Sequence, residues 1–325
     1  MVPHSGADSV SQSVAAGLPC LTKNRFRVEN PSGRKAAAAL QGAPENLPQM
    51  VKSGTISALF IGDTKRVVDV TTGFLPFFQV FATLGLPTGT AGKDEKTMRE
   101  TARKNLLTGA GFLGAFAVWT LLIQCVDVQA TGPQGTKVGF ASVNILLHRL
   151  TGEHLLIYTV TDWLGLVPIF ICMCFGALGF VQLIQRQSLL RVDTDLILLG
   201  VYYTLVIAAY LIFEMIPINY RPMLIEGRLE ASYPSSTTLL VLSVLPTLVF
   251  QINRRAENTL LRRAAAGFAV CFSAFMVVGR LVSGVHWATD IAASVLLSSG
   301  LYLLYRAAVL YISSPKEERW NSTKN

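Results

Sequence analysis

Three short polar segments of this 325-residue chain contain side chains that suit phosphoryl chemistry. Arg221 stands in the first segment, residues 214–222, and Arg280 opens the third, residues 280–290. A guanidinium offers five N–H donors in a planar fork that matches the oxygens of a phosphate group. We therefore expect both arginines to hold an oxyanion.

His286 and Asp290 lie four residues apart, a spacing that places two side chains on one face of a helix. A carboxylate that accepts a hydrogen bond from one imidazole nitrogen fixes the tautomer and leaves the other nitrogen free as a nucleophile. This spacing predicts a nucleophilic His286 that Asp290 orients.

Ser235, Ser236 and Thr237 follow Pro234 and open an apolar run that reads as a helix. Unpaired backbone N–H groups and the positive end of the helix dipole attract anions there. A serine-rich helix start is also an ordinary N-cap, and a single His or Arg near a helix end is usually structural. The combination of all three segments favours the functional interpretation, in which this helix start binds phosphate.

The elements that must position these residues are membrane helices. The chain is 51% apolar and 15% charged, with a mean hydropathy of +0.45, whereas soluble domains have about 25% charged residues. A helix needs about 20 apolar residues to cross the hydrocarbon core. Six segments approach that length and predict an all-α, six-helix transmembrane bundle with little strand: 105–126, 163–185, 196–213, 235–252, 264–279 extended past Arg280, and 291–312.

Lysines and arginines in short loops predict the orientation of these helices. Basic residues gather before the first helix, between the second and third, between the fourth and fifth, and after the sixth. Both termini are then cytoplasmic, and the three polar segments meet at the extracytoplasmic face. The net charge of +8 does not indicate nucleic-acid binding, because no stripe of arginines and aromatics accompanies it.

Residues 1–97 differ in composition from the rest. The first 50 are rich in Ala, Ser and Gly, and they lack the apolar core of a secretory signal. We expect a disordered or interfacial extension over 1–97 and a six-helix domain over 98–325; a transit peptide and a translation start at Met98 remain alternatives for this region.

The three segments resemble the type 2 phosphatidic acid phosphatase superfamily, whose patterns are Lys-x6-Arg-Pro, Pro-Ser-Gly-His and Ser-Arg-x5-His-x3-Asp. Arg221-Pro222 matches the end of the first pattern and Pro234-Ser235 the beginning of the second. Arg280, His286 and Asp290 match the third at its full spacing. The resemblance covers roughly residues 105–312.

The resemblance implies that His286 attacks phosphorus and forms a phosphohistidine, with Asp290 orienting the ring. Arg221, Arg280 and the backbone and hydroxyl of Ser236 would hold the phosphoryl oxygens, and water would hydrolyse the intermediate. The argument from the helix start adds Ser235 and Thr237 as phosphate-binding residues. Two arginines supply the charge stabilisation that a metal gives elsewhere, so no metal and no cofactor is expected.

This chain departs from the family patterns at four positions. Glu214 takes the place of the lysine, and Thr237 that of the histidine that protonates the leaving group. Ser236 replaces a glycine and Gly279 a serine. Because acid catalysis contributes about 10²–10⁴-fold, its loss favours a diphosphate, whose leaving group needs little proton assistance. Other donors could compensate: His148, His154, Glu226 and Glu230.

The sequence therefore predicts a metal-independent integral membrane phosphatase that acts on a lipid phosphate or diphosphate. Two alternatives remain open: a lipid phosphotransferase on the same scaffold, and a catalytically degenerate membrane protein that binds lipid headgroups. The expected partner is a membrane lipid and not a nucleic acid; the oligomeric state stays open.

Overall fold

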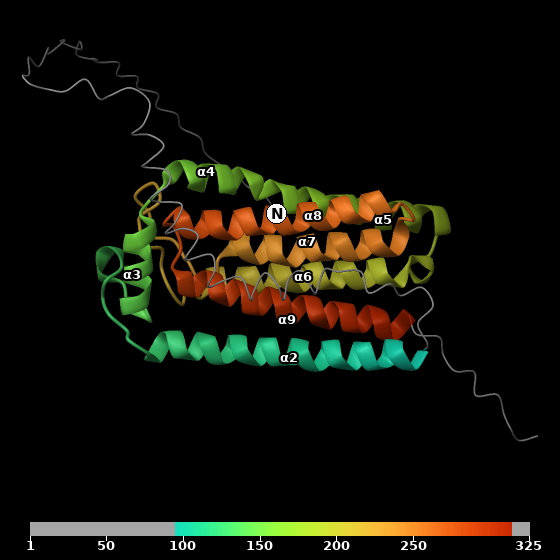
Figure 1. The fold of residues 1–325 in the computed structure, drawn as a ribbon, viewed down its shortest axis with the longest axis horizontal. Coiled ribbons are helices and arrows are strands. Elements are labelled where there is room, and N and C mark those ends of the chain that lie inside the picture. The colour runs from blue at the N-terminus through green and yellow to red at the C-terminus, as the bar shows by residue number, and fades with distance from the viewer. Residues whose placement is uncertain (1–94, 314–325) are drawn as a thin grey trace, which may run out of the picture. The chain divides into compact units, whose positions relative to one another are not determined.

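The computed structural model describes residues 95–313, and all regular structure in that range is helical (Figure 1). Its helices are α2 (Glu95–Cys125), η1 (Pro133–Gly135), α3 (Ala141–Thr151), α4 (Leu155–Leu164), α5 (Leu166–Arg186), η2 (Leu189–Arg191), α6 (Thr194–Met215), α7 (Ser236–Arg255), α8 (Thr259–Val282) and α9 (Ala288–Ser313). Six stretches of this range are long and apolar enough to cross a membrane, with α4 and α5 forming one of them. The predicted all-α fold of an integral, multi-pass membrane protein is confirmed.

The helices extend beyond the apolar segments expected from the sequence. α2 begins at Glu95, ten residues before the predicted start, and its first turn contains an ion pair between Glu95 and Arg99 at 2.6 Å. Charged turns of this kind carry a helix past the apolar core of the bilayer into the headgroup region. Of the expected extension over 1–97, residues 1–94 lie outside the described range. The short helix α3, in the loop after α2, was not predicted.

α7 and α9 form the interior of the bundle. Of their apolar windows, 61% and 67% of the residues are buried, against 6% for residues Leu155–Arg186. α9 packs against α2, α6 and α7. In Figure 1 the ribbons of α6 and α2 lie on either side of α9. Small hydroxyl residues such as Ser243, Thr247 and Ser298 are fully buried in these two helices, where they let neighbouring helices approach closely. The outer helices present their apolar side chains to the surroundings, as membrane helices do.

The two ends of the bundle differ in character. α3 lies at one end, on the left in Figure 1, together with the loops that carry the three polar segments. The opposite end has an ion-pair network in which Asp193, just before α6, contacts Arg186 of α5 at 2.8 Å and Arg255 of α7 at 3.0 Å. Hydrogen bonds from Gln182, Arg186 and Arg255 lower the pKa of Asp193 to about 2. This network joins three helices at the end of the bundle opposite α3, which we call the basic end.

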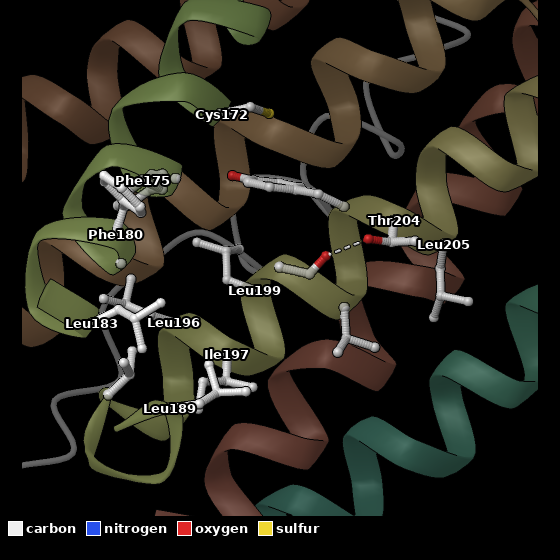
Figure 2. A pocket seen from close by; sticks show the side chains of 16 residues that line it. Cys172, Phe175, Phe180, Leu183, Leu189, Leu196, Ile197, Leu199, Thr204 and Leu205 are labelled. Carbon is white, nitrogen blue, oxygen red and sulfur yellow. Dashed lines mark hydrogen bonds between the residues drawn. The ribbon is translucent and has the colours of Figure 1, made fainter. Parts of the chain in front are cut away.

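An apolar groove of about 620 Å³ runs between α5 and α6 (Figure 2). Phe175, Phe180 and Leu199 are among its walls, and Leu189 and Leu196 place it towards the basic end. The residues that line it include no arginine, lysine or histidine. Its chemistry is that of a lipid-facing surface, and the candidate site for phosphate lies elsewhere.

Candidate functional site

The loop that follows α6 folds back on itself and brings the first two polar segments together. Tyr220 pairs with Ala231 in an isolated antiparallel bridge. The amide of Ser232 donates to the carbonyl of Asn219 at 2.9 Å, and the amide of Arg221 donates to the carbonyl of Glu230 at 3.1 Å. The third segment joins them, because the indole of Trp287 donates to the Tyr220 carbonyl at 2.8 Å. The structure therefore places all three segments at one end of the bundle.

His286 lies in the short connection between α8 and α9 and is only 3% exposed. Its Nδ1 is 3.1 Å from both the carbonyl oxygen and the hydroxyl oxygen of Ser232. Its Nε2 is buried and has no hydrogen-bond partner among the described residues. A carbonyl only accepts, so the bond to it assigns the ring proton to Nδ1 and leaves a lone pair on Nε2.

Asp290 is fully buried in the first turn of α9 and accepts three hydrogen bonds. The Ser232 hydroxyl donates to Oδ2 at 2.5 Å, the Trp287 amide donates to Oδ2 at 3.1 Å, and the Asn219 amide donates to Oδ1 at 3.1 Å. The expected direct bond from the His286 ring to this carboxylate is replaced by a contact through Ser232. The reason is tertiary: the loop after α6 inserts Ser232 between the two groups.

Arg280 lies at the end of α8 and is 1% exposed. Its Nη2 donates to Thr237 Oγ1 at 2.7 Å, and its Nη1 donates to Thr161 Oγ1 at 3.4 Å. The carboxylate of Asp162 is 3.6 Å from Nη2, and the Tyr158 ring lies under the guanidinium at 5.2 Å. The sequence analysis did not identify Thr161 and Asp162 as partners of Arg280. Polar residues within an apolar segment do not reveal which other helix they contact.

Gly279, directly before Arg280, packs closely against Thr161 of α4. A Cβ atom at Gly279 would lie 2.7 Å from Cγ2 of Thr161, closer than real Cβ contacts. The missing side chain therefore lets Thr161 approach α8 and reach Arg280. A hydroxyl from α4 thus contacts the guanidinium of Arg280.

Arg221 is the second guanidinium of the site. Its Nε is 3.1 Å from Glu230 Oε2, an ion pair that is not aligned as a hydrogen bond, and its Nη1 is buried with no hydrogen-bond partner in the described range. Burial holds the pKa of His286 well below its usual 6.5, and the positive charges of Arg221 and Arg280 lower this pKa further. Both arginines are therefore close enough to His286 for their charges to reach the ring.

The three hydroxyl residues at the start of α7, Ser235, Ser236 and Thr237, have different surroundings. Ser235 is fully buried, and its hydroxyl donates to Thr238 at 3.0 Å, so this expected phosphate ligand is used in helix packing. Ser236 lines a small cavity beside His286. Thr237 receives its hydrogen bond from Arg280. The hydroxyls that face the site are thus those of Ser236 and Thr237.

Glu214 lines the same small cavity as His286 and Ser236. Its side chain is exposed, and the ion pair of Arg221 is made by Glu230. The cavity has about 10 Å³, room for about one water. This cavity is smaller than a phosphoryl group.

The two histidines considered as alternative proton donors have other contacts. His148 Nε2 is 3.2 Å from the carbonyl of Gly284, and its ring packs on Trp287 with centroids 5.7 Å apart. His154 Nε2 is 2.9 Å from the carbonyl of Thr151. In residues 95–313 no three His, Cys, Asp or Glu side chains are grouped so as to hold a metal ion.

Comparison with known protein families finds the PAP2 superfamily over residues 215–313. This range contains every position that matches the family patterns, from Arg221 to Asp290, and begins one residue after Glu214. The resemblance expected from the sequence is confirmed. No curated protein and no solved structure matches the chain. The matched range and the six apolar helices together describe a phosphatase-type scaffold in a membrane.

Proposed function

We propose that this protein is a membrane phosphatase that releases phosphate from a lipid phosphate or diphosphate through a phosphohistidine on His286. One observation carries the proposal: the Nε2 atom of His286 is buried and has no hydrogen-bond partner among the described residues, within reach of the charges of the buried Arg280 and the half-buried Arg221. A buried polar atom without a hydrogen-bond partner costs free energy, so an unpaired Nε2 calls for an explanation. The two nearby arginines suggest one, because their positive charges would attract an anionic ligand to this nitrogen.

The proposed reaction has two steps. The Nε2 lone pair attacks phosphorus, and the bond from phosphorus to the leaving oxygen breaks with its electron pair on that oxygen. The proton on Nδ1 stays between the ring and Ser232. A water molecule then attacks phosphorus, the N–P bond breaks, and the ring regains its lone pair while inorganic phosphate leaves. Arg221 and Arg280 stabilise the charge on the phosphoryl oxygens in both steps.

The leaving group decides which substrate is favoured. A departing alkoxide needs a proton, and the position of the family's acid is Thr237, which accepts from Arg280. His148 and His154 are engaged with backbone carbonyls. A departing phosphate needs little protonation, so the site is better suited to a lipid diphosphate than to a lipid monophosphate.

The side of the membrane is assigned from charge. Arg186, Arg254 and Arg255 lie at the end of the bundle opposite His286. Because loops rich in Lys and Arg remain in the cytoplasm, the site faces the extracytoplasmic side. Lipids of the outer leaflet are then its substrates.

A second candidate function is binding of a lipid headgroup without turnover. Thr237 favours it, because it stands where the family has the histidine that protonates the leaving group, and its hydroxyl accepts from Arg280. The free Nε2 of His286 opposes it, since a binding site gains nothing from an unpaired nucleophile.

The test compares the purified full-length protein with His286→Ala and His286→Gln variants in detergent micelles that contain a prenyl diphosphate or a phosphatidic acid. Phosphate release is measured, and a radiolabelled phosphoryl group is trapped on the protein and tested for acid lability. We expect release and an acid-labile label only with His286 present, and faster release from the diphosphate. Ser298→Ala, which removes a buried hydroxyl elsewhere on α9, controls for folding. Equal release from all variants would refute the proposal.

A further inference from the structure

Ser232 lies where the family patterns assign no role, yet it contacts both His286 and Asp290. Its hydroxyl oxygen is 3.1 Å from His286 Nδ1 and 2.5 Å from Asp290 Oδ2, and the residue is 1% exposed. A hydroxyl has a single proton, and an ionised carboxylate can only accept. The proton of Ser232 is therefore donated to Asp290, and its oxygen is left to accept from the ring.

Asp290 is held so that it cannot take over the contact with the ring. The amide of Trp287 and the side chain of Asn219 donate to its two oxygens at 3.1 Å each. Both donors belong to segments that are bound to one another through Trp287 and Tyr220. The carboxylate thus faces Ser232 from a fixed position.

We infer that Ser232 is a positioning residue through which Asp290 acts on His286, an inference that rests on the proposed nucleophilic role of the ring. When Nε2 bonds to phosphorus, the ring becomes positively charged while its proton remains on Nδ1. That proton faces the carbonyl and the hydroxyl oxygen of Ser232. The negative charge of Asp290 polarises the hydroxyl, so the oxygen that faces the ring becomes a better acceptor as the charge develops.

The backbone at Ser232 permits a clean separation of these two contacts. Its amide is bonded to the Asn219 carbonyl at 2.9 Å, which holds the carbonyl of Ser232 in place when the side chain is changed. Ser232→Ala therefore keeps the bond that selects the tautomer and removes only the connection to Asp290. Ser232→Thr restores a hydroxyl.

The first experiment is a double-mutant cycle on kcat and KM with Ser232→Ala, Asp290→Asn and the combination. If the carboxylate acts through the hydroxyl, each single change lowers kcat about 10- to 100-fold with little change in KM, and the double variant is no worse than the poorer single one. Ser232→Thr recovers part of kcat. Ser298→Ala, combined with Asp290→Asn as a matched control, adds no loss of its own. Independent, multiplying losses from Ser232→Ala and Asp290→Asn would overturn the inference, because they would describe two unrelated structural contacts.

The second experiment does not depend on turnover. The side-chain ¹⁵N shifts of His286, assigned by comparison with His286→Ala, report the tautomer. We expect the δ-protonated tautomer in all of these proteins, and the same displacement of the Nδ1 shift in Ser232→Ala and Asp290→Asn, because each change weakens the hydrogen bond at that nitrogen. Ser298→Ala should leave the shift where it is. A His286 signal that Ser232→Ala leaves unaltered would overturn the inference even if the phosphatase reaction holds. If His286→Ala still released phosphate, the proposed function would fail, while the shifts would still decide whether Ser232 couples the two groups.

Discussion

The acid limb of the pH–rate profile tests the electrostatics of the site most directly. Burial lowers the pKa of His286, and the charges of Arg221 and Arg280 lower this pKa further, because each of them disfavours the protonated ring. Only the neutral ring has a lone pair on Nε2 for attack on phosphorus. The site should therefore keep its nucleophile at pH values where an ordinary histidine would be charged.

The magnitude follows from the usual pKa of 6.5. At pH 5.5 an imidazole with that value is neutral in only about 10% of molecules. With its pKa well below this value, His286 is neutral in a larger fraction of molecules at pH 5.5, so protonation of the ring should reduce kcat/KM there by less than it would for an ordinary histidine. The same shift affects stability: the unfolded chain takes up a proton as pH falls through 6.5 and the native ring does not, so stability declines below that pH.

The assay measures phosphate release between pH 4.5 and 8. The rates are corrected for protonation of the substrate, whose phosphate group has a second pKa of about 6. A titration of the His286 ring by NMR in the free protein supplies the midpoint without that correction. Arg221→Gln removes a neighbouring positive charge and should move the midpoint upward, while Arg263→Gln at the basic end should not. A midpoint at or above 6.5 in the unchanged protein would refute this account of the site.

Three further outcomes are expected. Glu214→Gln removes a negative charge from the cavity beside the nucleophile and should lower KM for an anionic lipid about two- to fivefold, whereas Glu257→Gln at the far end leaves KM as it was, a difference that steady-state kinetics will show. Gly284→Ala should cost about 1–3 kcal/mol in thermal unfolding, because φ is +74° and a Cβ there would lie 2.6 Å from the carbonyl of Gly152; Gly267→Ala, with no atom within 4 Å, provides the harmless comparison. Asp193→Asn should lower the melting temperature at pH 7. The difference in melting temperature from the unchanged protein should narrow as pH falls from about 4 towards 2, because the lowered pKa means that the carboxylate stabilises the fold only while ionised. A difference that does not depend on pH would contradict this.

The membrane fold was predictable because its cause is local. Each spanning helix satisfies its own backbone hydrogen bonds, so a long apolar run is nearly sufficient to identify it. Six such runs were recognised. The predicted helices were too short, because their charged ends were left out; α2, for example, begins at Glu95 and not at residue 105. α3 was missed because a short helix in a loop carries no comparable signal.

The reactive pair was partly predictable for a similar reason. His286 and Asp290 are four residues apart, and their spacing with Arg280 is written in the sequence. The shared helix face expected from this spacing was wrong, because His286 lies before the start of α9 and only Asp290 lies on that helix. The contacts of Arg280 with Thr161 and Asp162 were not predictable, since they join α8 to a helix more than 100 residues earlier. Polar residues at the tips of apolar helices are common, and spacing alone does not tell which of them meet.

By itself the sequence determined that six helices span a membrane, and that an imidazole, a carboxylate and two guanidinium groups stand in segments that the topology brings to one end. The tertiary structure alone decided that Ser232 separates His286 from Asp290, that Ser235 turns into the helix packing, and that Glu230 takes the ion pair with Arg221. The physical reason is distance. Helix formation and membrane insertion depend on neighbours a few residues apart, whereas a hydrogen bond between loops depends on ångström-scale positions set by the packing of the whole bundle.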